Sequence, residues 1–336
     1  MLAGFDADET KKDLIRRFVG RRAPARLRRR FRQLDEERLA KLEASIARYY
    51  AGADVESFLN TQAGKKSVHE VLQRIRLARE DVIPWIERYV SLDGARVLEI
   101  GCGTGADVVA LAEQGANVIA MDIDEGALTV ARDQCSAYAV EATILLGNAI
   151  EAGRMFGNEK FDLVILFACL EHMTPEERAV VMRETWDLVP TGKLWCVIET
   201  PNRLWWYDSH SAQLPFFNWL PDELALRYSE FSEREWFRGL QQGGNTDKSM
   251  LKMRRAGRGV SFHEFDLYIK PAAQLHVVGD KEIFYRQRNL LSFLRWLIRR
   301  KDRRYESLLR SMRPDLHPAF FQAYLNLLIR KDTEGG

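Results

Sequence analysis

The sequence predicts an α/β protein built on a mostly parallel sheet that helices cover on both faces. Two observations carry this prediction. Short apolar runs alternate with helical segments from residue 96 onward, and a glycine-rich loop follows the first of these runs. Strands that alternate with helices are joined by right-handed crossovers, which make neighbouring strands parallel and place helices on both faces of the sheet.

The alternating region supplies five predicted strands and the helices between them. A further helix is expected to begin after Thr174, because Pro175 suits the first helical position and Glu177 can close a capping box with the threonine. The strands are expected at residues 96–100, 117–123, 142–147, 161–168 and 193–199, and two of the helices at 106–114 and 125–138.

The flanking parts of the chain are predicted to be largely helical. Residues 26–50 place Phe31, Leu34, Leu42, Ile46 and Tyr49 at helical spacings, and a second helical run ends near Val90. An aromatic stretch at 201–228 is too irregular for one helix, 241–259 is expected to be a mobile polar linker, and 289–330 is expected to form amphipathic helices. The predicted units are a helical region 1–90, a nucleotide-binding core 91–200, an inserted substrate cap 201–260 and the remainder of the core with terminal helices 261–336.

Composition limits the class of protein. The 336 residues are 46% hydrophobic and 29% charged, which suits a chain with a sizeable core. The formal net charge of +2 argues against a dedicated nucleic-acid binder, although residues 1–50 and 286–304 are basic. The basic helices could contact a membrane surface or simply form a solvated face. The four cysteines form no C-x-x-C pair, which indicates reduced thiols in a cytoplasmic protein.

The glycines in the loop after the first predicted strand are typical of a nucleotide-binding loop. Gly101, Gly103 and Ala106 fit the dinucleotide pattern G-x-G-x-x-G/A, while Gly101, Gly103 and Gly105 fit the G-x-G-x-G loop of S-adenosylmethionine (SAM) enzymes. Both patterns need a strand, a tight turn and a helix. The glycines alone therefore leave both cofactors open.

Glu99 favours SAM. A dinucleotide places its pyrophosphate over the glycine loop, where a carboxylate two residues before the first glycine would repel it. SAM carries no phosphate and offers a cationic amine and a sulfonium near the loop, which an acidic side chain suits. Asp122 ends the second predicted strand, 21 residues after Gly101, where a carboxylate binds ribose hydroxyls in either cofactor class. Asp124 is expected to cap the next helix.

Five successive segments resemble the motifs of the class I SAM-dependent methyltransferases: VLEIGCGTG, VIAMDID, LLGNA, FDLVILFACLEHM and LVPTGKLWCVIETPN. The resemblance covers about residues 96–202 and implies a Rossmann-like, doubly wound sheet of seven strands with SAM as cofactor. It implies that Glu99, Gly101 and Gly103 line the methionine end, that Asp122 and Ile123 hold the ribose and flank the adenine, and that Asn148 and Ala149 meet the adenine edge. Cys102 and Phe167 complete the expected cofactor wall. The family usually has Asp at the position of Asn148.

Methyl transfer to a hydroxyl also needs a group that removes the hydroxyl proton, and histidine suits this task near neutral pH. His172 follows the fourth predicted strand at its carboxyl end, where open α/β sheets bind ligands. His210 lies in the aromatic stretch with Asp208 nearby, and His263 is a third candidate beside Glu264. These four, His172, His210, Asp208 and His263, are the predicted catalytic residues.

The aromatic stretch is the predicted acceptor site. Flat rings would bury an acceptor and exclude water, and a cation could bind an anionic group on it. The residues assigned to this role are Arg203, Trp205, Trp206, Tyr207 and Trp219. The segment ETPNRLWWYDSHSAQLPFFNWLP is also similar to a stretch of bacterial methyltransferases linked to surface glycans and specialised metabolites.

The predicted reaction is O-methylation of a small molecule, a glycan or a lipid-linked metabolite. No metal site is expected, because the sequence shows no clustered Asp/His pattern. Nucleic acid is not the expected partner, and a homo-oligomer is compatible with the sequence. Three alternatives stay open: an RNA methyltransferase that uses the basic segments, a SAM-binding protein without catalysis, and an NAD-dependent dehydrogenase.

Overall fold

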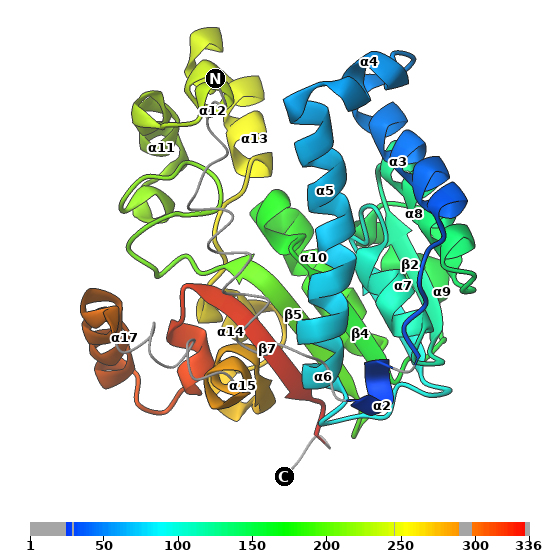
Figure 1. The fold of residues 1–336 in the computed structure, drawn as a ribbon. Coiled ribbons are helices and arrows are strands. Elements are labelled where there is room, and N and C mark those ends of the chain that lie inside the picture. The colour runs from blue at the N-terminus through cyan, green and yellow to red at the C-terminus, as the bar shows by residue number, and fades with distance from the viewer. Residues whose placement is uncertain (1–24, 29, 245, 289–297, 333–336) are drawn as a thin grey trace.

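The computed structural model describes residues 25–28, 30–244, 246–288 and 298–332, and its centre is one seven-stranded sheet (Figure 1). The strand order is β3-β2-β1-β4-β5-β7-β6. The first five strands run parallel, and β7 lies antiparallel between β5 and β6. The mostly parallel sheet of seven strands is therefore confirmed. The strands are β1 Arg96–Ile100, β2 Asn117–Asp122, β3 Thr143–Leu146, β4 Leu163–Phe167, β5 Leu194–Pro201, β6 His276–Asp280 and β7 Tyr324–Arg330.

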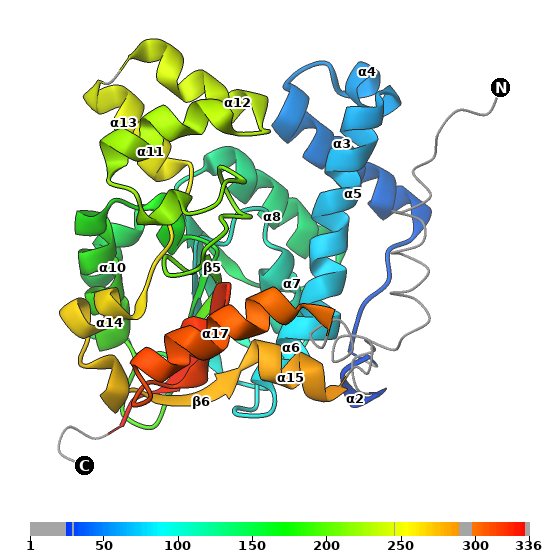
Figure 2. The same cartoon turned by 90° about the vertical axis from the view of Figure 1, so that its left-hand side faces the viewer.

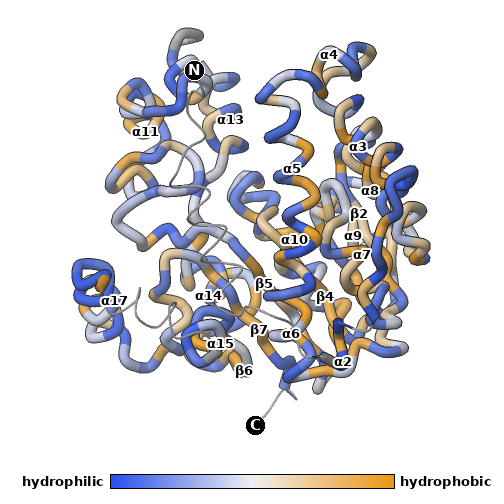
Figure 3. The backbone as a smooth tube through the Cα atoms, in the orientation of Figure 1, coloured by the Kyte–Doolittle hydropathy of each residue, from blue (hydrophilic) through white to orange (hydrophobic). Residues whose placement is uncertain are grey.

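Helices pack on both faces of this sheet, and each face has its own apolar core. Figure 3 shows hydrophobic segments gathered on the strands and on the helices that pack against them, with much of α17 hydrophilic. One layer contains α3 Glu36–Ala51, α5 Gln62–Leu77, α6 Ile83–Ile86, α7 Ala106–Ala112, α8 Glu125–Ala137 and α15 Lys281–Arg288. The other contains α9 Ala152–Phe156, α10 Pro175–Asp187, α14 Phe262–Tyr268 and α17 Arg300–Met312.

The predicted elements of the central region are all present. The five strands and the helices α7 and α8 lie within one to three residues of their expected bounds. At α10, the Thr174 side chain accepts from the amide of Glu177, whose carboxylate accepts from the amide of Thr174, and Pro175 opens the helix. Local sequence therefore determines this part of the fold.

Three predictions outside that region differ from the structure. Phe31 and Leu34 precede α3, because the Asp35 side chain caps the helix by accepting from the amide of Arg38. The stretch predicted as a mobile linker contains α13 Asp247–Arg255, which Thr246 caps. The stretch predicted as amphipathic helices contains α17 and then the strand β7; its first residues, 289–297, lie outside the described part of the chain.

Residues beyond β5 form a lobe at the carboxyl edge of the sheet. In Figure 2 the helices α11 Asp222–Tyr228, α12 Glu235–Arg238 and α13 stand together above α10, apart from the strands. The lobe has its own small core around Phe217, Phe237 and Met253, all fully buried. We call this lobe, residues 202–260, the cap. Throughout the described ranges, every helix is too short or too polar to cross a bilayer. The remaining helices are α2 Ala25–Arg28 and α4 Val55–Asn60.

Candidate active site

A cavity of about 1550 Å³ opens at the carboxyl ends of β1, β2, β4 and β5. The strand order reverses between β1 and β4, and open α/β sheets bind ligands in the crevice at that point. Side chains from α3, α5, α15, α17 and the cap complete the wall. The cavity therefore joins parts of the chain that are far apart in sequence.

The glycine loop forms the floor of the cavity. Gly101 has a φ of 76°, and a Cβ atom on it would lie 2.6 Å from the Cβ of Cys169, so only glycine fits between β1 and the loop after β4. The amide of Gly103 donates to Oδ2 of Asp122 over 2.8 Å, which ties the loop to the tip of β2. No atom lies within 4 Å of a Cβ built on Gly103, so a ligand can approach its backbone closely.

Two buried carboxylates face this end of the cavity. Glu99 is 1% exposed, and among the described residues nothing hydrogen-bonds to its Oε2 or to Oδ1 of Asp107. Burial, then the nearby Asp107 and Asp122, raise the pKa of Glu99. Burial and then Glu199 raise the pKa of Asp107 to about 7, against the opposing charges of Lys281 and Arg74. A nearby cation would stabilise the ionised form of carboxylates with unpaired buried oxygens, and the ammonium and sulfonium groups of SAM have the charge to do so.

The opposite end of the cavity has groups that suit a nucleoside. Asp122 accepts from the amides of Gly103 and Asp124, and Ile123 beside it is 68% exposed, an apolar side chain available to a ring. Asn148 and Ala149 line the same wall. The Oδ1 atom of Asn148 accepts from the amide of Ile150 over 3.2 Å and keeps a second lone pair.

Tyr49 closes this end from the N-terminal helix α3. Its hydroxyl donates to Oδ2 of Asp124 over 2.8 Å, while Oδ1 of Asp124 caps α8 as expected. Burial, and then the bond to Asp124, raise the pKa of Tyr49 to about 12, so the hydroxyl stays protonated as a donor. The helical N-terminal region thus contributes directly to the cofactor end of the cavity. From its helical spacing in the sequence, Tyr49 was expected only to pack within a helix.

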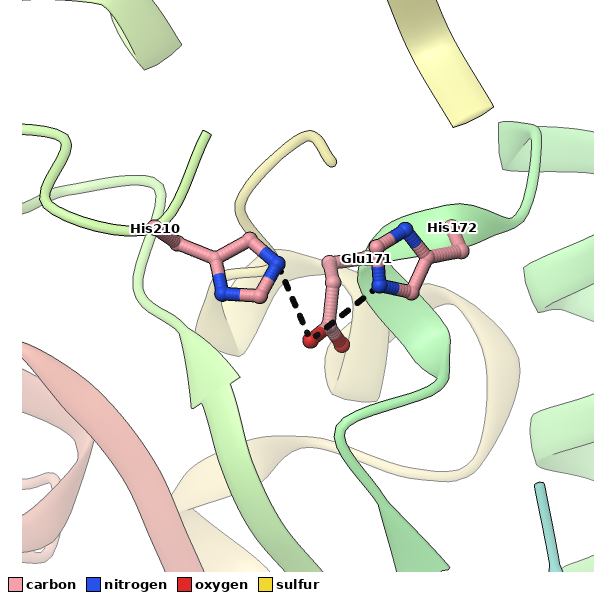
Figure 4. A group of neighbouring side chains, drawn as sticks. All are labelled: Glu171, His172 and His210. Carbon is pink, nitrogen blue, oxygen red and sulfur yellow. Dashed lines mark ion pairs between the residues drawn. The ribbon is translucent and has the colours of Figure 1, made fainter. Parts of the chain in front are cut away.

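His172 and His210 meet on either side of one carboxylate (Figure 4). The Nε2 atoms of His172 and His210 lie 4.0 Å and 3.7 Å from Oε1 of Glu171, and the ring centroids lie 5.4 Å apart. Glu171 is fully buried, and burial raises its pKa to about 8. Burial, then the neighbouring His172, lower the pKa of His210. The loop after β4 and the cap therefore build one cluster, which we call the Glu171–His172–His210 cluster.

The backbone on both sides of this cluster is fixed. Nδ1 of His172 donates to the carbonyl oxygen of Arg255 over 2.8 Å, and the amide of Arg258 donates to the carbonyl oxygen of Glu171 over 2.9 Å. Gly257, with a φ of 125°, packs so closely on His210 that an added Cβ would lie 2.9 Å from the ring. The chain segment 255–258 therefore supports both histidines.

Four of the predicted catalytic and acceptor-binding residues do not lie where they were expected. Asp208 is buried, and its carboxylate accepts from the amides of His210, Ser211 and Ala212, so it fixes a turn and does not contact the imidazole of His210. His263 is exposed and stacks on Phe262 outside the cavity. Arg203 and Trp219 also lie outside the cavity lining, and Trp219 packs against Phe216 and Tyr305.

The other aromatic residues do line the cavity. Trp205, Trp206 and Tyr207 form part of its wall, and Nε1 of Trp206 donates to Asp302 of α17 over 3.3 Å. The ring of Trp205 packs edge-on against Tyr305 of the same helix. These contacts join the cap to α17 and leave flat apolar surfaces facing the space beside the histidine pair.

Several site residues were not identified from the sequence. The signal for Glu171 was its position beside His172 after β4, although its burial could not be foreseen. Lys281 of α15 pairs with Glu199 over 2.8 Å, and Glu199 itself has a φ of 54° at an irregular point of β5. Ala168, after β4, has a φ of 44°. Such left-handed backbone at two adjacent strand ends is typical of functional sites.

Known proteins resemble this chain mainly in its core. Residues 97–192 match the family model described as a methyltransferase domain. The ubiquinone biosynthesis O-methyltransferase of Xylella fastidiosa is 30% identical over 161 residues, 47% of this chain and 63% of that protein. That of Stutzerimonas stutzeri is 33% identical over 159 residues, 47% of this chain and 60% of that protein. The chain thus spans less than two thirds of these relatives.

Among solved structures, a SAM-dependent methyltransferase from Methanosarcina mazei is 26% identical. The match covers 36% of this chain and 59% of that one, with a TM-score of 0.33.

Proposed function

We propose, for a chain that carries a class I SAM-dependent methyltransferase domain, that the whole protein transfers a methyl group to a hydroxyl of a small molecule, a glycan or a lipid-linked metabolite. The observation that carries this proposal is one cavity that holds two contrasting groups of side chains. Two carboxylates, each with one unpaired buried oxygen, lie at the glycine loop, and a carboxylate between two histidines lies farther along the loop after β4.

The first task of the chain is to hold the cofactor, which supplies an electrophilic methyl group when bound. Glu99 and Asp107 would take the ammonium group, and Arg74 in the same wall would take the carboxylate of the methionine end. Asp122 would accept hydrogen bonds from the ribose hydroxyls. The glycine loop has no side chains in the way, so the ligand could lie close to its backbone. Ile123 and Ala149 would flank the adenine. Each of these groups already faces the cavity.

The second task is to place the acceptor and keep water away. Displacement at a methyl group gains most of its rate from alignment of the two reacting atoms and from exclusion of water. Trp205, Trp206 and Tyr207 provide flat walls for this, braced by α17 through Tyr305 and Asp302. A sugar face, an aromatic ring or an isoprenoid-linked ring would fit such surfaces.

The third task is to remove the acceptor's proton. Cys169, two residues before Glu171, contacts Gly101 of the cofactor loop, so the Glu171–His172–His210 cluster begins beside the methyl-donor end. A hydroxyl placed between the cluster and the cofactor would lose its proton to the cluster or through it. The names of the matched relatives, which specify O-methyl transfer, also favour a hydroxyl acceptor.

Incubation of the protein with methyl-labelled SAM tests the function. Small-molecule, lipid and RNA fractions from the source cell serve as separate acceptor pools, and His172→Ala is compared with His263→Ala as its matched control. We expect the label to appear in an alkali-stable ether in the small-molecule or lipid fraction. The amount of labelled product should fall with His172→Ala and stay unchanged with His263→Ala. Label in RNA would instead favour the nucleic-acid alternative. Tight SAM binding without labelling of any fraction would favour a non-catalytic role.

A further inference from the structure

The Glu171–His172–His210 cluster has the composition of a metal-binding site. Each side chain offers one ligand atom, and the three atoms lie within 4.8 Å of one another. Two imidazole nitrogens with one carboxylate oxygen is a common ligand set of catalytic zinc sites, which leave a further position open for a substrate oxygen. The cluster was not expected from the sequence, because His210 is 38 residues from His172 and reaches it only through the fold of the cap.

The carboxylate of Glu171 is the strongest single sign of a missing partner. The residue is fully buried, and the groups that approach its carboxylate are its own backbone amide and the hydroxyl of Thr200, neither with the geometry of an ordinary hydrogen bond. The imidazole nitrogens at 3.7 Å and 4.0 Å are too far away for hydrogen bonds. A buried carboxylate with such weak partners is costly, and a cation at the convergence point would satisfy it.

The ring orientation of His172 suits metal binding. A backbone carbonyl can only accept, so the 2.8 Å contact with Arg255 places the ring hydrogen on Nδ1 of His172. In the neutral imidazole, Nε2 then carries a bare lone pair, and that atom faces Glu171 (Figure 4). Ligating histidines usually donate their second nitrogen to a carbonyl or carboxylate in this way.

Metal binding would draw the three ligand atoms closer together. Ligand atoms about 2.0–2.1 Å from a tetrahedral Zn²⁺ lie roughly 3.3 Å from one another. The separations from Glu171 exceed this by about 0.4 Å and 0.7 Å, and all three atoms lie within 4.8 Å of one another, so both imidazoles would have to rotate toward the carboxylate. Both histidines also line the cavity, so the open side of the site faces the acceptor space.

We propose that Glu171, His172 and His210 bind a divalent metal ion, Zn²⁺ by preference, whose open position takes the acceptor oxygen. This inference rests on the proposed function and adds how the acceptor is held and activated. A hydroxyl bound to the ion would lose its proton to Oε2 of Glu171, the carboxylate oxygen that does not face the imidazoles. The oxygen would then form a bond to the methyl carbon as the carbon–sulfur bond breaks, and the electron pair of that bond would pass to sulfur.

Metal binding is measured first, without any acceptor. The full-length protein is stripped with a chelator, dialysed and titrated with ZnCl₂ by calorimetry. Co²⁺ is then added as a spectroscopic probe of coordination. We expect one ion per chain, and visible Co²⁺ bands of four- or five-coordinate geometry. Glu171→Gln, His172→Ala and His210→Ala should each weaken Zn²⁺ binding on the order of 100-fold, whereas the exposed His263→Ala and His276→Ala should bind as the unaltered chain does.

Two further variants separate ligation from folding. His210→Cys supplies another zinc ligand at the same place, so it should keep more of the Zn²⁺ affinity than His210→Ala. SAM binding by each variant reports whether the Rossmann-like core is intact, because the cofactor groups lie on other strands. If saturable Zn²⁺ binding is missing, or persists in all three ligand variants, the inference is overturned.

The two proposals fail differently. Zn²⁺ binding that depends on the three residues, with no labelled product from any fraction, would support the metal site and contradict the proposed function. Labelled product formed at full rate by the chelated, metal-free protein would support the function and overturn the role of the ion.

Discussion

Nδ1 of His172 donates to the carbonyl oxygen of Arg255 over 2.8 Å, and through this bond the loop after β4 and the end of α13 hold each other in place. The two residues are 83 positions apart in the sequence. Because the bond joins the core to the cap, the orientation of the imidazole depends on how the cap is seated. Contacts between core and cap should therefore affect turnover more than cofactor binding.

Replacement of either clustered histidine should reduce turnover. We expect His172→Ala and His210→Ala to lower kcat by roughly 100-fold or more, the usual size of a contribution from proton removal. The Kd for SAM should stay nearly unchanged, because the groups proposed to bind it, Glu99, Asp107 and Asp122, are other residues. Steady-state rates with the identified acceptor and calorimetry with SAM measure the two quantities. Near-normal kcat in both variants would show that the acceptor needs no help to lose its proton.

A methyl group added at Gly257, within the segment 255–258 that supports both histidines, should displace the His210 ring. Gly257→Ala adds a Cβ 2.9 Å from the His210 ring at a φ of 125°, so we expect lower kcat and a loss of stability of about 1–3 kcal/mol. Gly52→Ala is the matched control, because its φ of 65° carries similar backbone strain with no atom within 4 Å. Denaturant unfolding and turnover are compared for both. Equal losses of kcat in the two variants would contradict a specific effect on His210.

SAM affinity should depend on pH through Asp107. Its pKa is raised to about 7, and only the ionised carboxylate attracts the ammonium group. Affinity should therefore be full above pH 7 and decline by up to about tenfold per pH unit below it. Asp107→Asn should weaken binding at pH 8 and flatten the profile, while Glu125→Gln on the surface should do neither. A flat profile for the unaltered chain, measured by calorimetry from pH 6 to 8, would refute this assignment.

Arg178 should be a major source of stability for the site. Its guanidinium is 3% exposed and donates to the carbonyl oxygens of Leu170, Arg258 and Gly259 and to the carboxylate of Glu264. Arg178→Ala leaves these buried acceptors unsatisfied, so we expect a loss of about 3–5 kcal/mol in the free energy of unfolding. Arg183→Ala, exposed on the same helix, should change it by less than about 0.5 kcal/mol. Urea denaturation of both variants decides the matter, and similar midpoints would contradict this role.

The sequence was most informative where local signals and the sheet pattern agree. Gly101, Asp122 and Thr174 could be placed because a tight turn, a strand tip and a helix cap each follow from neighbouring residues. β7 was mistaken for helix because YLNLLIR is a short, mostly apolar run, which periodicity cannot assign to strand or helix. Only its pairing with β5 and β6 settles its conformation.

The site beyond the cofactor loop could be predicted only in part. His172 and His210 were identified by chemistry, but the buried Glu171 between them depends on the fold of the cap. Asp208 was expected near the His210 ring and instead caps a turn, since its short side chain reaches the following amides first. Tyr49, Lys281 and the α17 side chains enter the cavity through long-range packing, which no local pattern encodes.

Because β7 lies between β5 and β6, the sheet can be completed only after the last strand has been synthesised. The parallel strands and the cofactor loop have all been synthesised by Pro201, but β6 has no sheet neighbour until residues 324–330 follow it. Until then β5 is an open edge, the kind of surface on which nascent chains aggregate. Tyr324 and Asn326 of the cavity wall arrive with the same strand. A chain stalled before residue 324 would thus display five paired strands of the seven, with the β7 part of the cavity wall missing.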